Sequence, residues 1–239
     1  LGSVNNRVDI NLSGNLENTG VIVGKTGLDV NAQTIRNVNG NLESQGTINL
    51  VGASLNVGTI KGQHVNATLG NGLTVNAGET ITASGNVDIN TSGGVTNRGS
   101  LIASGTLGVS GTSLNNIGSI RSSGNNTLNF SGNLSNSGTL SSASTLIVNG
   151  GTLSNSGTVA GTNLDINTHV NNTNLVYASS NLNINGSVTN NNSIFSSGNA
   201  IISGSSITNN AGNITAAGNL TLSGTITNNR SGSVSFDSS

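Results

Sequence analysis

The residues that could do chemistry are few and spread along the chain. Cleavage of a polysaccharide needs two carboxylates at a defined separation, or a metal held by a cage of ligands. The acidic residues of this 239-residue chain are Asp9, Glu17, Asp29, Glu43, Glu79, Asp88, Asp165 and Asp237. No two of these residues form an evident catalytic pair of carboxylates, so the sequence predicts no catalytic residue.

The other reactive side chains lead to the same conclusion. His64 and His169 are about five repeats apart, too far to share a metal ion, and the absence of Cys excludes thiol chemistry and disulfides. Ser is abundant, but no Gly-x-Ser-x-Gly elbow occurs. Calcium-binding nonapeptide repeats need a regular Asp after Gly-x-Gly, which is missing. We therefore expect no enzyme, no metal and no cofactor. A carbohydrate-binding or carbohydrate-active β-helix, of the lyase or glycosidase kind, is the alternative.

Composition narrows the choice of partners and of fold. A net charge of −1 without a Lys/Arg cluster leaves nothing to neutralise a nucleic-acid backbone. No apolar run approaches the roughly 20 residues of a membrane span. Apolar residues make up 32% of a nearly neutral chain, which argues against disorder. With 2% aromatics and no Met or Trp, the core must be built from Val, Ile, Leu and Ala, and it must be narrow.

A repeat organises the whole chain. The segment LSNSGTL at Leu134–Leu140 returns as LSNSGTV at Leu153–Val159, 19 residues later. The apolar residue that closes each such unit, here called the anchor, is found at Ile22, Leu42, Ile60, Ile81, Leu101, Ile120, Leu140, Val159, Val176, Ile194, Ile214 and Val234. The spacing averages about 19 residues, which predicts a solenoid of about twelve coils.

The segments after the anchors alternate with period two, as in Leu107–Val109, Leu146–Val148 and Leu220–Leu222. Period two is strand geometry, and Gly, Asn, Ser, Thr and Val are poor helix formers. Proline, which would remove a ladder hydrogen bond, is absent. The sequence therefore predicts an all-β parallel β-helix with inward anchors, forming one continuous segment over residues 1–239.

An asparagine recurs shortly before most anchors. Stacked Asn side chains can hydrogen-bond along the coil axis, and Asn tolerates the left-handed conformation of a corner. The positions are Asn18, Asn37, Asn97, Asn116, Asn136, Asn155, Asn172, Asn190, Asn209 and Asn228. We predict a structural Asn ladder, with ligand binding as the alternative. Three units are irregular. Asn56 keeps its spacing to Ile60, but Ser54 replaces the apolar residue that opens the unit. Ala77 and Glu79 replace the Asn and Gly expected before Ile81, and Asn174 replaces the Gly expected before Val176.

One pair of side chains is a candidate contact patch. Tyr177 and Phe195 each directly follow an anchor, so both should point outward from adjacent coils. Exposed rings commonly mark contact sites, and their faces suit sugars. The alternative is that they merely cover a corner. An ice-binding Thr ladder is disfavoured, because Thr-x-Thr occurs at Thr80–Thr82 and Thr225–Thr227, at different places in the repeat.

Two units of the chain carry a family resemblance. The segments GTLSNSGTVAGTNLDI (151–166) and NNAGNITAAGNLTLSGTITN (209–228) resemble the haemagglutinin repeats of the filamentous haemagglutinin family. These are the long secreted adhesins and contact-dependent growth inhibition proteins of Gram-negative bacteria. The resemblance covers nearly the whole chain and implies a single-stranded, right-handed parallel β-helix.

The resemblance also implies a function and a location. Family members pass through an outer-membrane transporter by two-partner secretion, and their secretion domain carries an Asn-Pro motif. This chain has no proline and looks like a piece of the shaft. We therefore expect a structural rod at the bacterial surface that extends a binding or effector region toward a receptor on a host or neighbouring cell, a role in adhesion and virulence.

Overall fold

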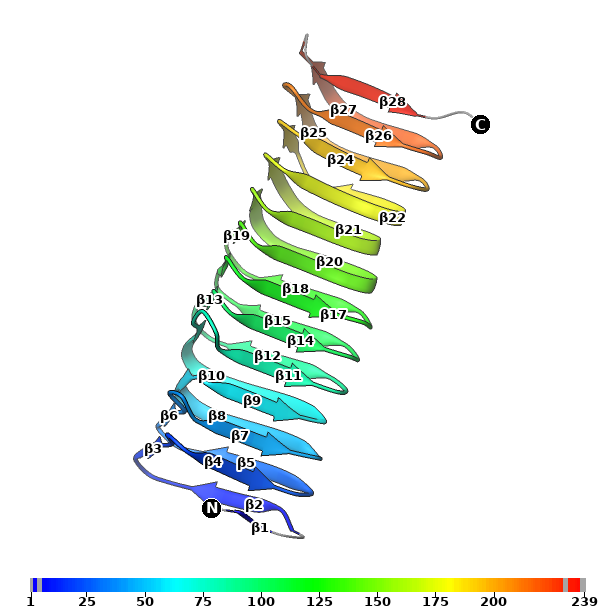
Figure 1. Ribbon diagram of the computed structural model, residues 1–239. Helices are drawn as coiled ribbons and strands as arrows, with labels where there is room; N and C mark the ends of the chain where they lie inside the picture. The colour runs from blue at the N-terminus through cyan, green and yellow to red at the C-terminus, as the bar shows by residue number, and fades with distance from the viewer. Residues whose placement is uncertain (1, 4–5, 230–231, 237–239) are drawn as a thin grey trace. The chain divides into compact units, whose positions relative to one another are not determined.

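The computed structural model describes residues 2–3, 6–229 and 232–236. Every regular element within these ranges is a β-strand, and no helix that could cross a membrane occurs among them. The chain divides into two compact units, residues 1–124 and residues 125–239. Each unit is a stack of coils, coloured blue to green for the first unit and green to red for the second (Figure 1).

The first unit contains strands β1 to β17. They are β1 (Gly2–Ser3), β2 (Val8–Asn11), β3 (Asn15–Glu17), β4 (Val21–Gly24), β5 (Gly27–Asn31), β6 (Thr34–Arg36), β7 (Asn41–Ser44), β8 (Thr47–Asn56), β9 (Thr59–Gly62), β10 (His64–Val75), β11 (Thr80–Ala83), β12 (Val87–Thr91), β13 (Val95–Asn97), β14 (Ser100–Ala103), β15 (Leu107–Gly111), β16 (Leu114–Asn116) and β17 (Ser119–Ser122).

The second unit contains strands β18 to β28. They are β18 (Asn126–Phe130), β19 (Leu134–Asn136), β20 (Thr139–Asn155), β21 (Thr158–Asn172), β22 (Leu175–Asn185), β23 (Val188–Asn190), β24 (Ser193–Ser196), β25 (Ala200–Asn209), β26 (Asn213–Ala216), β27 (Leu220–Asn228) and β28 (Ser233–Phe236). The longer strands bend around corners of a coil, so one strand covers what two or three strands cover elsewhere.

The pairing within each unit confirms the predicted fold class. Strands pair in parallel with the equivalent strand of the next coil, and the anchors pair with one another. In the first unit Ile81 lies beside Ile60 and Leu101. In the second unit Val176 lies beside Val159 and Ile194. The protein is therefore a parallel β-solenoid of about twelve coils with a repeat near 19 residues, as the sequence predicted.

The core is a narrow column of aliphatic side chains, because alternate residues of every strand point inward. All anchors from Leu42 to Ile214 are fully buried. The second strand of a coil adds residues such as Ile89 and Leu146, and the third adds residues such as Leu153. The composition predicted this kind of aliphatic core, to which the buried ring of Phe130 on β18 also contributes.

At some corners, an Asn side chain accepts the hydrogen bond of a backbone N–H group in the next coil. The backbone N–H of Thr106 donates to Asn86 Oδ1 at 3.0 Å, and the N–H of Asn219 donates to Asn199 Oδ1 at 2.9 Å. In each case the acceptor belongs to the preceding coil. The side chains of Asn86 and Asn199 therefore link successive coils at these exposed corners, outside the strands.

Candidate functional site

The most extensive polar feature of the second unit is the predicted Asn ladder. Each Asn side chain donates through Nδ2 to the Oδ1 of the next Asn. The five distances are 2.8 Å for Asn136 to Asn155, 2.8 Å for Asn155 to Asn172, 2.8 Å for Asn172 to Asn190, 2.9 Å for Asn190 to Asn209 and 2.9 Å for Asn209 to Asn228. The first five of these six side chains are buried.

The ladder amides of the second unit also form hydrogen bonds within the turn that follows them. Asn172 Nδ2 donates to the carbonyl oxygens of Asn174 at 2.9 Å and Ser193 at 3.0 Å, while its Oδ1 accepts from the backbone N–H of Asn174 at 3.3 Å. One side chain therefore joins two coils and closes a turn. Amide chains of this kind polarise one another, so a ladder with all partners present fixes the register of the stack.

The first unit carries the same ladder with an interruption. Asn18 donates to Asn37 at 2.6 Å, and Asn97 donates to Asn116 at 2.8 Å. Between these two pairs the ladder position is occupied by Val57 and Val75, both fully buried. Val75 pairs directly with Asn97, and the side chain of Asn37 donates to the carbonyl oxygen of Val57 at 2.6 Å. Counting back from the anchors had placed the position at Asn56 and Ala77.

This interruption explains an unusual buried atom. Asn97 Oδ1 is buried and has no hydrogen-bond partner among the described residues. In the regular ladder this oxygen accepts from the Asn of the preceding coil, but here the preceding side chain is Val75, which has no donor. The turn before Ile60 is also tightened: Gly58 has φ +54°, and a Cβ there would lie 2.0 Å from the carbonyl oxygen of Asn37.

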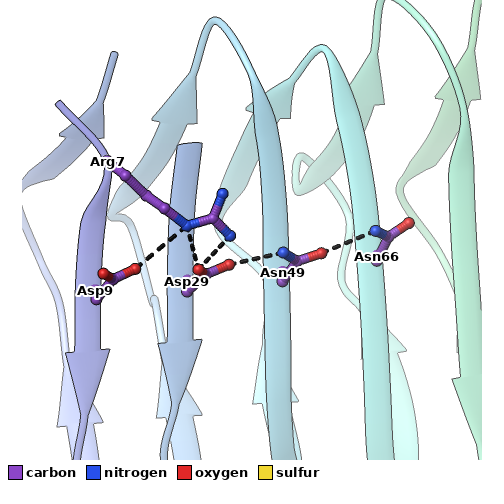
Figure 2. Close-up of polar contacts among 5 residues, drawn as sticks. All are labelled: Arg7, Asp9, Asp29, Asn49 and Asn66. Carbon is purple, nitrogen blue, oxygen red and sulfur yellow. Dashed lines mark hydrogen bonds and ion pairs between the residues drawn. The ribbon is translucent and has the colours of Figure 1, made fainter. Parts of the chain in front are cut away.

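A second row of polar side chains lies on the outer surface of the first unit (Figure 2). Asp9 and Asp29 are in register on β2 and β5, although the sequence showed no evident pair of acids. Arg7 contacts both carboxylates, with Nε 3.3 Å from Asp9 Oδ1 and with hydrogen bonds to Asp29. Asn49 then donates to Asp29 at 2.7 Å, and Asn66 donates to Asn49 at 2.8 Å.

The electrostatics of this row argue against general acid catalysis. Desolvation raises the pKa of Asp29, but hydrogen bonds from Arg7 and Asn49 outweigh it, and the pKa lies below its ordinary value. The hydrogen bond to Asp29 likewise raises the pKa of Arg7. A general acid needs a raised pKa so that it still carries a proton near neutral pH. Asp29 remains ionised near neutral pH. The ion pairs and hydrogen bonds of this row connect successive coils of the first unit.

The two histidines accept hydrogen bonds from backbone N–H groups at corners, one in each unit. His64 Nδ1 accepts from the backbone N–H of Asn86 at 3.0 Å, and His169 Nδ1 accepts from the N–H of Ser187 at 3.1 Å. Among the described residues, no three His, Asp or Glu side chains come together in a way that could hold a metal ion.

The two rings singled out in the sequence lie against each other in the second unit. Tyr177 pairs with Phe195 across β22 and β24, with ring centroids 5.6 Å apart and ring planes 9° from parallel. Both side chains are half-buried, and the Tyr177 hydroxyl lies 3.3 Å from Ser197 Oγ. The rings therefore turn one face toward each other, and each keeps a second face directed toward the neighbouring coil on its far side.

Parallel coils tied by an internal amide ladder define the protein as a β-solenoid of structural repeats. Comparison with known proteins gives the family. The haemagglutinin repeat model matches residues 3–74, 62–116, 102–175 and 158–238, so the chain belongs to the haemagglutinin repeat family. No curated protein and no solved structure matches the chain. The family is a structural repeat of secreted adhesins.

Proposed function

We propose that this chain is a shaft segment of a secreted bacterial surface protein, an adhesin or a contact-dependent toxin-delivery protein. In this proposal the two units continue each other over residues 1–239 as one β-helix. The shaft holds a binding or effector region away from the outer membrane. A surface receptor on another cell is the target of that region.

The observation that carries this proposal is the Asn ladder. In the second unit it joins each coil to the next through hydrogen bonds of 2.8 to 2.9 Å between side-chain amides, and no three His, Asp or Glu side chains come together in the described residues. Stacked repeats bury one continuous core and stiffen a long, thin body. These features suit a spacer whose length depends on the number of coils.

The same architecture fits export through an outer-membrane two-partner secretion transporter. A folded coil offers the next segment a ready row of strand partners and one free ladder amide, so coils can add one at a time as the chain emerges. A lyase-like or glycosidase-like β-helix is the second candidate, but Asp29 does not suit its general acid, because the lowered pKa keeps this carboxylate ionised.

Removal of one coil tests the shaft function. Deleting Leu134–Thr152 from the parent protein removes 19 residues and joins Asn133 to Leu153, which restores the repeat sequence. We expect normal secretion, β-rich circular dichroism and unchanged cell binding, because only one coil of about 4.8 Å is lost. Deleting Leu134–Ala143, about half a coil, is the control and should abolish folding.

A folded and secreted whole-coil deletion that no longer binds cells would contradict the proposal. That result would place the receptor site in the deleted coil and would make the segment a binding module in its own right.

A further inference from the structure

The aromatic pair of the second unit offers a surface that the shaft function does not use. Tyr177 and Phe195 belong to a column of outward side chains that continues through Ser141 and Ala160 on one side and through Thr215 on the other. The rings thus stand as two parallel plates in a row of small residues. Because they stack on each other, the faces left for a ligand are the two outer ones.

The outer face of Tyr177 is the more open of the two. Beyond it lie Ala160 and then Ser141, which rise little above the sheet, whereas the outer face of Phe195 looks onto the branched Thr215. Two coils of small residues give a floor of roughly 10 Å along the axis. A flat six-membered ring can stand on this floor and stack on Tyr177 at about the spacing of the coils. We call this space, bounded by Tyr177, Ala160 and Ser141, the Tyr177 slot.

The chemistry around the slot selects the ligand. Between Asn125 and Asn229 the sequence contains one Asp and no Glu, Lys or Arg. That residue, Asp165, lies on β21 five residues after Ala160, beyond the register shift that follows Gly161, and Asn183 donates to it at 3.0 Å. Between Asn125 and Asn229, no charged side chain other than Asp165 is therefore available to hold a phosphate, sulfate or ammonium group. The slot instead offers hydroxyl groups from Ser141 and from Thr158 and Thr162, which lie two positions before and after Ala160 on β21. The Thr162 hydroxyl donates to the carbonyl oxygen of Ala143 at 2.9 Å, so it can only accept a hydrogen bond from a ligand.

We propose that the Tyr177 slot binds a neutral glycan, with one pyranose ring stacked on the outer face of Tyr177 and its hydroxyl groups facing Ser141, Thr158 and Thr162. Sugar rings present C–H groups on one face and hydroxyl groups at their edges. A single aromatic plate with a polar, uncharged rim matches both. This inference rests on the register of the coils and does not depend on the chain being a shaft.

The sequence provides its own probe for the slot. Tyr177 is the single Tyr, and the chain has no Trp, so intrinsic fluorescence reports on this ring alone. The protein is titrated with cellohexaose, with a galactan hexaose and with a heparin hexasaccharide as the anionic comparison. We expect a saturable change in Tyr177 fluorescence with at least one neutral hexaose, and at least about tenfold weaker binding of the anionic one.

Two matched substitutions locate the ligand. Ala160→Phe places a ring on the floor of the slot, and Thr215→Phe places the same ring on the far side of Phe195. Both positions are outward and half-buried, so both variants should fold. We expect Ala160→Phe to weaken binding at least about tenfold, because the stacking face is covered, and Thr215→Phe to change it by less than about twofold.

Three results would overturn the inference. They are no response to either neutral hexaose, equal affinity in the Ala160→Phe variant, and a fluorescence change that follows protein concentration without sugar, which would assign the rings to a contact between two copies of the chain. None of these results bears on the whole-coil deletion, so failure of the slot and failure of the shaft function are distinguishable.

Discussion

Replacing Leu140 with Asp should destabilise the protein by about 3–5 kcal/mol. Leu140 is an anchor with 0% exposure, and it lies beside Val159 in the core of the next coil. A carboxylate at this place loses its water and finds no cation, which costs several kcal/mol. Because each coil of a solenoid contacts only its neighbours, the damage should also divide the second unit into parts that unfold separately.

Ser135→Asp is the matched control for this experiment. Ser135 is exposed and lies between two buried residues of β19, Leu134 and Asn136. An outward charge there should change stability by no more than about 0.5 kcal/mol. Urea unfolding followed by circular dichroism gives both values, and similar losses for the two variants would mean that the assignment of inward and outward positions is wrong.

The second large effect concerns one atom of the ladder. Asn172→Asp keeps the shape of the side chain but replaces Nδ2, whose two N–H groups are shared among three acceptors, with a carboxylate oxygen. That oxygen would face the Oδ1 of Asn190 and two backbone carbonyl oxygens. Lost bonds and repulsion between acceptors together should cost about 3 kcal/mol or more at neutral pH.

Asn171→Asp makes the same chemical change one residue earlier, on an exposed side chain, and should be nearly neutral. The ladder variant should also respond to pH in a defined direction. Its buried carboxyl group binds a proton more tightly in the folded chain than in the unfolded one. The difference in the free energy of unfolding between this variant and the unsubstituted protein should therefore shrink as the pH falls toward about 4, the ordinary carboxyl range. An equal loss for both variants would show that the ladder contributes nothing specific.

The fold and most of the ladder could be predicted from the sequence because both repeat at a fixed interval. Alternation of apolar residues sets which side chains point inward, and a parallel ladder forces equivalent residues into one column. This places Leu140 in the core and Asn155 next to Asn172 without any knowledge of the corners.

The interruption at Val57 and Val75 could not be found in this way, because corners absorb differences in length. In a regular coil the ladder residue lies four positions before the anchor, as Asn97 does before Leu101. Val57 lies three before Ile60 and Val75 six before Ile81. Positive φ angles at Gly58 and Gly78 accommodate these short and long turns. Counting along the sequence therefore misses the position that strand pairing defines.

The outer row of Asp9, Asp29 and Asn49 was missed for a related reason. These residues lie about 20 positions apart in the sequence, and they meet because their strands are in register. The stacking of Tyr177 on Phe195 could be predicted from their places after two successive anchors, but the direction of the ring faces could not. That direction depends on side-chain rotation, and it leaves the outer faces of the pair for a ligand.

The most direct test of the proposed shaft is the distance between coils of the two units. The chain contains no Cys, so spin labels can be attached at Thr82→Cys and Thr215→Cys without other changes. These residues follow the anchors Ile81 and Ile214, which are seven repeats apart in the sequence. Pulsed electron paramagnetic resonance should show one narrow distribution of label-to-label distances at about 34 Å. The pair Lys61→Cys with Thr215→Cys should give a distance longer by about 4.8 Å, the height of one coil. A broad distribution, or a distance that does not grow by one coil, would contradict a continuous β-helix.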